Sequence, residues 1–259
     1  MKTFKVLSID WDYLVKATMD ERLKMFPDGG NEKLPEIISN MIWSVRYTSY
    51  PQLKDIGVDT DAMGILNEFI SKNCFDSPVV VSDSHRDIWN AILRYKSKDS
   101  PIDVINVDFH HDMYVNDIGH VDCGNWVNCL FETKTQYSRK LKNKDNHYYW
   151  IAREDSDDYL TEECQRLNYM VKKDINFLKN LDDFECNLLF ICRSSIWSPP
   201  HLDEEFMNFY KWCIDNTSGT QPCSVNSKVT HSRYTQEMKK DIQSQMEIFS
   251  KIRIGGNNE

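Results

Sequence analysis

The sequence contains no long hydrophobic run. None of the apolar stretches among its 259 residues approaches the roughly 20 residues that a membrane helix requires. The N-terminus enters a strand-like segment at once and lacks the apolar region and small-residue cleavage site of a secretory signal. We therefore expect a cytoplasmic protein that does not associate with membranes.

Positive charge is in the minority. Lysine and arginine number 31 against 40 aspartate and glutamate residues, which gives a formal net charge of -9. Because such a surface repels a phosphate backbone, nucleic acid is not an expected partner. A cationic substrate or a metal ion fits this charge better.

Two familiar classes of motif are also missing. The eight cysteines are irregularly spaced and include no C-x-x-C pair, which excludes a zinc ribbon. Without a secretion signal, we expect reduced and mostly buried thiols. Neither G-x-x-x-x-G-K-S/T nor G-x-G-x-x-G occurs, so no phosphate-binding loop of these types is expected.

Short apolar segments rich in β-branched residues alternate with segments of helical periodicity. The predicted strands are Phe4–Ile9, Pro78–Ser82, Val104–Val107, Tyr148–Ala152 and Asn187–Cys192. The predicted helices are Lys33–Arg46, Asp61–Lys72, Ile88–Tyr95, Thr161–Asn180, Asp203–Asn216 and Gln236–Ile252. This alternation predicts an α/β fold with a mostly parallel sheet. We expect a single domain over residues 1–259, with a long loop at about 217–235 and a frayed tail at 253–259.

Aspartate and histidine gather directly after three of the predicted strands, where α/β proteins place their ligands. The six residues in question are Asp10, Asp12, His85, Asp108, His110 and Asp112. In an extended chain the side chains of residues i and i+2 point the same way, so each group can aim at one spot. Converging carboxylates would repel one another or take up protons unless a cation lay among them. The pattern predicts one or two divalent metals, and carboxylate with imidazole suits manganese, iron or zinc.

Other interpretations of these motifs exist. Asp10-x-Asp12 is also common as a turn or helix cap, and it matches the nucleophile pair of haloacid-dehalogenase phosphatases. In that class Thr or Val usually stands where this sequence has Leu14, and the expected Lys-plus-acid ending is missing. Calcineurin-type phosphoesterases share D-x-H but add two glycine-containing motifs that do not occur here. Three motifs on three strand ends favour the metal site.

The same motifs resemble those of the arginase and agmatinase (ureohydrolase) superfamily. Val107–Asp112 resembles its D-A-H-x-D motif, Ser8–Asp12 its S-x-D-x-D motif and Ser82–His85 its G-G-D-H segment. More closely, the chain resembles the peptide arginases, which accompany ribosomally made, post-translationally modified peptides and convert peptidyl arginine to ornithine. The likeness extends through Asp122–Trp126 and Ser194–Pro200 and covers about the first 200 residues.

The sequence departs from the family pattern in three ways. The S-x-D-x-D motif comes first instead of late, so the layout looks permuted; Phe109 replaces alanine; and no double glycine precedes Asp83. The resemblance implies a three-layer αβα fold and an arginase-type hydrolase of C–N bonds in linear amidines, with two Mn²⁺ per chain. It implies hydrolysis of the guanidinium of arginine in a precursor peptide, giving ornithine and urea.

The resemblance also implies roles for single residues. Asp83 and Asp87 are candidates to orient the His85 imidazole, with a salt bridge to Arg86 or a helix cap as the alternative, and His111 is expected to face away from the metals. The six ligands divide into bridging Asp108 and Asp10, His85 and Asp112 on one metal, and His110 and Asp12 on the other.

The remaining site residues are placed less directly, because the permutation prevents a position-by-position transfer. His120 is the candidate proton relay, and Asp122 and Glu154 are the candidate carboxylates for the guanidinium. Asn125 and Trp126 are the candidate substrate-binding residues, with Trp126 packing against the substrate stem. Each has a structural role as its alternative.

Two other functions stay open. One is hydrolysis of a small guanidino compound or another amide, as in a free arginase, an agmatinase or a deacetylase-like enzyme. The other is a metal-stabilised binding protein without catalysis. The preference for a peptide over free arginine rests on the resemblance alone.

Overall fold

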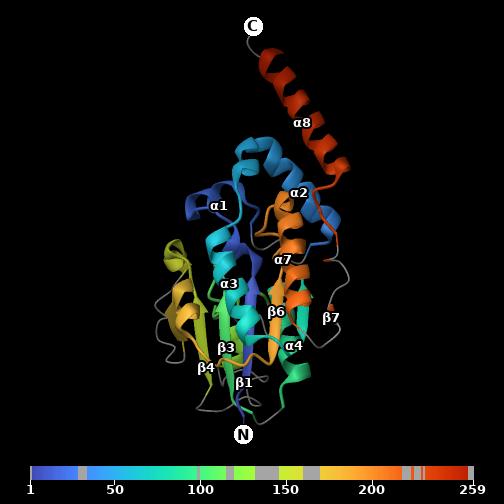
Figure 1. The fold of residues 1–259 in the computed structure, drawn as a ribbon. Coiled ribbons are helices and arrows are strands. Elements are labelled where there is room, and N and C mark those ends of the chain that lie inside the picture. Colours follow the sequence, from blue (N-terminus) through green and yellow to red (C-terminus); the bar gives the residue numbers. More distant parts are fainter. Residues whose placement is uncertain are drawn as a thin grey trace.

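The computed structural model describes residues 2–28, 34–97, 100–114, 120–131, 146–159, 170–217, 223–224, 229 and 231–255. Its centre is an all-parallel sheet of six strands, extended at one edge by a two-residue strand, in the order β5-β4-β3-β1-β6-β2-β7 (Figure 1). The strands are β1 Phe4–Asp10, β2 Val79–Ser82, β3 Ile102–Val107, β4 His147–Ile151, β5 Met170–Lys173, β6 Leu188–Cys192 and β7 Cys223–Ser224.

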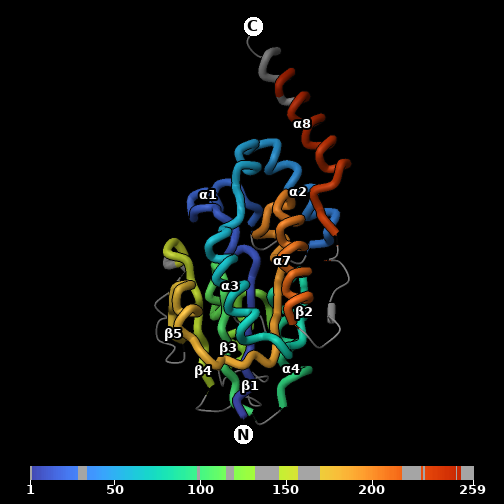
Figure 2. The backbone as a smooth tube through the Cα atoms, in the orientation of Figure 1, coloured from blue at the N-terminus to red at the C-terminus, as the bar shows by residue number. Residues whose placement is uncertain are grey.

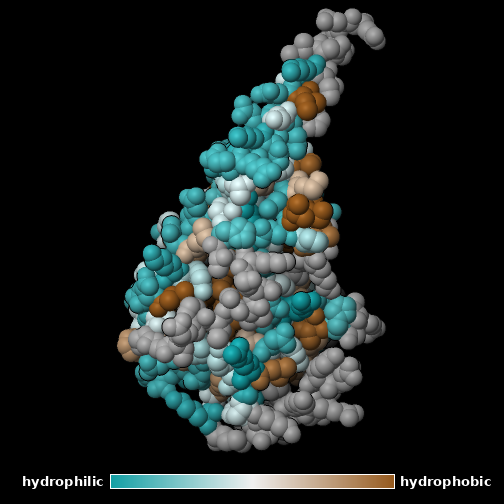
Figure 3. Space-filling model, turned by 90° about the vertical axis from the view of Figure 1, so that its right-hand side faces the viewer, coloured by the Kyte–Doolittle hydropathy of each residue, from teal (hydrophilic) through white to brown (hydrophobic). Residues whose placement is uncertain are grey.

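Helices cover both faces of this sheet. The α-helices are α1 Met19–Met25, α2 Glu36–Ser49, α3 Thr60–Asn73, α4 Ile88–Tyr95, α5 Trp126–Phe131, α7 Asp203–Asn216 and α8 Gln236–Gly255. Short 3-10 helices are η1 Trp11–Leu14, η3 Pro51–Asp55, η4 His85–Asp87, η6 Glu154–Tyr159, η7 Ile175–Asn180 and η8 Pro200–Leu202. The helix α8 projects beyond the rest of the described chain and is mostly hydrophilic on the side shown in Figure 3.

The alternation of side chains along the buried strands creates two cores. Leu7 and Ile9 of β1 point to a core that also contains α3 and α7, which cross in front of the strands in Figure 2. Val6 points the other way, to a core completed by α4 and α5. Because both sheet faces are buried, the inner strands β2 and β6 are nearly continuous apolar runs, as expected of a parallel sheet. The predicted three-layer αβα fold is therefore confirmed.

The direction in which successive strands are added to the sheet reverses at β1. The chain passes from β1 to β2 on one side, with β6 between them, and then returns to β3 on the other side. The register keeps the strand ends level, because Ile9 pairs with Val107 and both Asp10 and Ser82 pair with Cys192. A crevice for ligands is expected at such a switch point, outside the carboxyl ends of the strands. The predicted ligands lie here.

The predicted elements agree well with the structure, with three corrections, the first of which is that the predicted loop at about 217–235 contains the short strand β7. The prediction of a helix over Thr161–Asn180 is wrong from residue 170 onward, where the chain forms β5 and η7; residues 161–169 lie outside the described part. β5 is a strand whose residues alternate in burial, so it lacks the apolar run of the inner strands. The predicted tail at 253–259 begins within α8, and residues 256–259 lie outside the described part.

Candidate metal centre

Four of the six predicted ligands meet around one imidazole nitrogen. The Nδ1 atom of His85 lies 3.2 Å from Asp10 Oδ2, 3.0 Å from Asp108 Oδ2 and 3.0 Å from Asp112 Oδ2. All four side chains are buried. They come from the ends of β1 and β3 and from the 3-10 helix that follows β2, so the level strand ends explain why they meet.

The other two ligands form a second group that shares Asp108. The Nδ1 atom of His110 lies 3.1 Å from Asp12 Oδ2 and 3.7 Å from Asp108 Oδ1. Two sets of potential metal ligands result, Asp10 with His85 and Asp108, and Asp12 with Asp108 and His110; within each set the ligand atoms lie within 4.8 Å of one another. Asp108 therefore belongs to both sets.

The ligand atoms converge as they would around a cation, and two of them lack a well-directed hydrogen bond. His85 Nδ1 and Asp12 Oδ2 are buried, yet neither makes a well-directed hydrogen bond within the described part of the chain. Leaving such buried polar atoms without a hydrogen bond is unfavourable. Carboxylate oxygens and imidazole nitrogens suit manganese, iron or zinc, so these residues fit a metal.

The charges of this cluster are poorly balanced. Burial, together with the neighbouring carboxylates, raises the pKa of Asp10 to about 7. Burial and the charge of Asp108 raise the pKa of Asp112. Burial alone would also raise the pKa of Asp108, but the contacts with His110 and His85 bring it well below the usual range. Asp108 is thus strongly ionised, whereas Asp10 and Asp112 take up protons more readily than usual. A divalent cation would stabilise the ionised form of all three carboxylates.

His85 is held in place by groups outside the ligand set. The hydroxyl of Ser8, on β1, lies 2.7 Å from its Nε2 atom. The ring stacks on Phe190 with centroids 5.8 Å apart and contacts Trp126 at 5.2 Å. Histidines that bind metals commonly have their second nitrogen fixed in this way. Asp83 and Asp87 were the predicted orienters; instead Ser8 lies at this nitrogen, while Asp83 pairs with Arg193 and Asp87 Oδ2 accepts a hydrogen bond from Ser82.

The carboxylates after β3 are also fixed. Asn106 Nδ2 donates to Asp108 Oδ2 at 3.1 Å, and the indole of Trp150 donates to the Asp108 carbonyl at 2.9 Å. The indole of Trp126 donates to Asp112 Oδ2. Asp112 has a φ of 53°, in the left-handed region that few non-glycine residues enter. This turn aims the Asp112 side chain at His85.

Phe109 stands where the D-A-H-x-D motif has alanine, and it is packed among neighbouring side chains. It is fully buried, and the guanidinium of Arg22 lies 3.9 Å from its ring centroid. Arg22 also donates to the carbonyl of Asp12 at 2.6 Å. The larger side chain is therefore part of the packing that fixes Asp12.

The two imidazoles differ in exposure. The side chain of His85 is 2% exposed, whereas that of His110 is 12% exposed. The ring of His110 contacts Trp197, with centroids 4.8 Å apart. His110 is therefore the less enclosed of the two imidazoles, although its Nε2 atom is itself buried. His111 is turned into the core, where its ring contacts Tyr114 and Trp150.

The predicted substrate-binding residues are buried. Asn125 is 2% exposed, and its amide holds a turn by donating to the His120 carbonyl at 3.0 Å and accepting from the Asp122 amide at 2.8 Å. Trp126 is fully buried and holds Asp112. Neither therefore presents a surface to a substrate here. His120 and Glu154 are exposed, and the catalytic roles of His120, Asp122 and Glu154 remain predictions.

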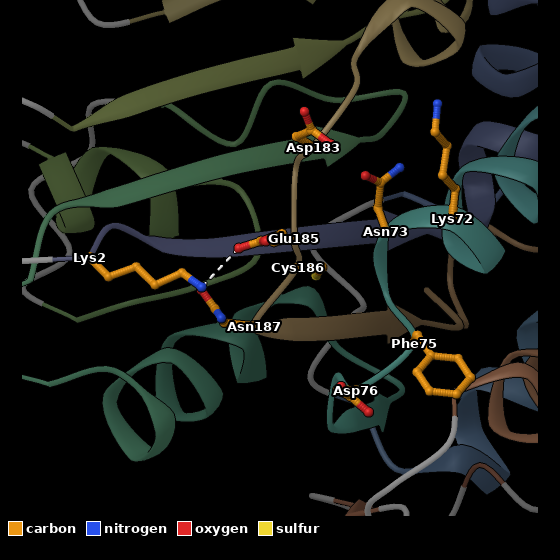
Figure 4. Close-up of a pocket in the computed structure, with 9 residues that line it drawn as sticks. All are labelled: Lys2, Lys72, Asn73, Phe75, Asp76, Asp183, Glu185, Cys186 and Asn187. Carbon is orange, nitrogen blue, oxygen red and sulfur yellow. Dashed lines mark ion pairs between the residues drawn. The ribbon is translucent and has the colours of Figure 1, made fainter.

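A cavity of about 400 Å³ lies elsewhere, at the amino ends of the strands. Figure 4 shows Lys2 and Asn187 on its wall, and Lys2 pairs with Glu185 at 2.8 Å. Because Lys2 and Asn187 precede β1 and β6, this cavity lies at the end of the sheet opposite to the Asp and His cluster. It is no part of the candidate metal centre.

No protein-family model, curated protein or solved structure matches this chain. Within the described residues, no helix combines the length and apolar character that crossing a membrane would require.

Proposed function

We propose that this protein is a binuclear manganese hydrolase that converts arginine in a ribosomally made precursor peptide to ornithine and releases urea. The observation that carries the proposal is the pair of buried ligand sets that share Asp108. The similarity of the surrounding motifs to those of peptide arginases supplies the substrate and the choice of Mn²⁺.

The protein side chains would have distinct tasks in this reaction. Asp108 would contact both metals, with His85 and Asp112 completing one site and Asp12 and His110 the other. Asp10, which the resemblance makes a second bridging ligand, belongs to the His85 set alone among the described residues. Bound divalent cations supply what the side chains lack, because they lower the pKa of water enough to make hydroxide available near neutral pH. Ser8 and Trp126 would keep His85 and Asp112 in position.

The charge of the site suits the proposed substrate. A guanidinium has a pKa above about 12 and is always charged at neutral pH. Two Mn²⁺ would balance the four aspartates of the cluster, so the attraction for the guanidinium would come from Asp122 and Glu154 and from the formal net charge of -9. His120, which is exposed, is our proposed proton relay for the departing amine, and Asp122 and Glu154 are the proposed carboxylate partners of the guanidinium.

The test uses the full chain, stripped of metal and reloaded with Mn²⁺. We would incubate it separately with an arginine-containing peptide and with free arginine, and measure peptide mass and urea. The expected result is conversion of peptidyl arginine to ornithine with one urea released per residue. Asp108→Asn, which keeps the side-chain shape but removes the shared charge, is expected to abolish it.

Two outcomes would contradict the proposal in different ways. Urea from free arginine alone would keep the chemistry and exclude the peptide substrate. Unchanged substrates with bound metal confirmed would favour another amide substrate or a binding protein without catalysis.

A further inference from the structure

A partly buried tryptophan, Trp197, lies beside His110, the less enclosed imidazole of the metal centre. Trp197 follows β6, whose carboxyl end lies between those of β1 and β2. Its ring contacts His110 at a centroid distance of 4.8 Å and is only partly buried. Most other large aromatic groups near the centre, such as Trp126 and Phe109, are fully buried. Trp197 therefore has ring surface left for a ligand.

The backbone that carries Trp197 is held by buried polar contacts. Arg233 donates to the Ser195 carbonyl and, at 2.9 Å, to the Ser198 carbonyl. The indole of Trp43 donates to the same Ser195 carbonyl at 2.9 Å. Arg233 is fixed in turn by two hydrogen bonds to the buried carboxylate of Asp203, at 2.9 and 2.6 Å.

This support is built across long sequence distances. Arg233 lies just before α8, and it grips the carbonyls on both sides of Trp197. Ser194, at the start of the segment, has a φ of 53°, so the chain bends sharply as it leaves β6. The contacts of Arg233 thus fix the backbone on both sides of Trp197 and, with it, the position of the Trp197 indole.

We propose that Trp197 binds the substrate guanidinium through its ring face, and that Arg233 is the positioning residue that sets the ring beside His110. The inference rests on the proposed function and names the group that selects for a planar cation. Tryptophan is the best aromatic partner for a cation, and planar guanidinium groups stack on aromatic faces. The same contact already occurs next to this site, where the Arg22 guanidinium lies 3.9 Å from the Phe109 ring centroid.

The first experiment measures binding without turnover. Metal-free protein is titrated calorimetrically with acetyl-Gly-Arg-Gly-amide and with the same peptide carrying citrulline, which has the shape of arginine but no charge. Trp197→Leu is expected to weaken binding of the arginine peptide roughly fivefold to thirtyfold and leave the citrulline peptide almost unaffected. Trp197→Phe keeps an aromatic face and is expected to lie between. Trp212→Leu, at a partly buried tryptophan of α7, is the matched control and is expected to bind as wild type does.

The second experiment tests the positioning role. Arg233→Lys keeps the charge but cannot grip Asp203 and both carbonyls, so KM for the arginine peptide should rise several-fold while kcat changes little. Trp43→Phe removes a single hydrogen bond to the Ser195 carbonyl and decides the question if Arg233→Lys does not fold. A loss of stability in urea with unchanged KM in the folded variants would overturn the positioning role.

The outcomes separate this inference from the proposed function. Equal loss of both peptides, or no loss of either, in Trp197→Leu would overturn the cation contact even if wild-type protein releases urea. Selective loss of the arginine peptide would support the contact even if wild-type protein released none.

Discussion

Two clusters of charged side chains lie at the carboxyl ends of the strands, and they differ in how their charges are balanced. In the first, three further aspartates and two histidines surround Asp108, and the buried atoms His85 Nδ1 and Asp12 Oδ2 make no well-directed hydrogen bond. In the second, Arg193 and Arg233 lie among Asp83, Asp203 and Glu36, with direct contacts between opposite charges. We call them the metal cluster and the arginine cluster.

The difference shows which charges the chain balances by itself. Asp203 lies between the two guanidinium groups, 2.6 Å from Arg233 and 3.5 Å from Arg193, so the arginine cluster contains its own counter-ions. The metal cluster has an excess of carboxylate, which raises the pKa of Asp10 and Asp112 and which a bound divalent cation would neutralise. The arginine cluster should therefore stabilise the protein with or without metal, whereas the metal cluster should couple folding to metal binding.

The largest effect is expected from the residue that both ligand sets share. Asp108→Asn removes a charge from each set, so manganese content should fall to well below one ion per chain and peptide hydrolysis by several orders of magnitude. Metal analysis after dialysis and a urea assay would check this. Full manganese content in the variant would show that Asp108 is not the shared ligand.

The second effect concerns the arginine cluster. Asp203→Asn leaves two buried guanidinium groups without their common carboxylate, and such a loss typically costs about 3–5 kcal/mol of unfolding free energy. Urea denaturation of metal-free protein would measure it. The contrast between the clusters would fail if this variant were as stable as wild type.

A third, smaller effect is the stabilisation by metal itself. With free Mn²⁺ at about 100 times its dissociation constant, the gain in unfolding free energy should be about 2.7 kcal/mol for one site. Asp203→Asn should gain the same increment, and Asp108→Asn should gain almost none. Thermal denaturation with and without Mn²⁺ compares the three proteins, and an equal gain in Asp108→Asn would contradict the assignment.

The smallest effect is expected from the group behind His85. Ser8→Ala removes the hydroxyl at Nε2, so manganese affinity should fall roughly 10- to 100-fold while the fold is kept. A competition titration with a chelator would measure the affinity. Ser77→Ala is the matched control, because it removes another buried hydroxyl, 2.8 Å from the Cys186 carbonyl at the far end of the sheet. The orienting role of Ser8 would be excluded if both variants bound manganese like wild type.

The ligands of the metal cluster could be predicted because each lies at the carboxyl end of a strand or within five residues of it, so the parallel sheet brings their segments together. The arginine cluster could not, since Arg233 and Asp203 are 30 residues apart and Arg193 and Asp83 are 110 apart, and nothing local marks them as partners. The burial of Trp126 could not be predicted from the sequence either, because its position near the motifs favoured a substrate contact. Side chains that support a site depend on tertiary packing, whereas strand-end ligands follow from the sheet.

The left-handed backbone at Asp112 restricts how this site can change over generations. Glycine and asparagine tolerate a φ of 53°, but each would discard the carboxylate charge. Glutamate would keep the charge and lose both the backbone fit and the reach. No single replacement therefore keeps the carboxylate charge, its reach and the left-handed backbone together. In proteins that depend on the metal, substitutions at residue 112 should be selected against.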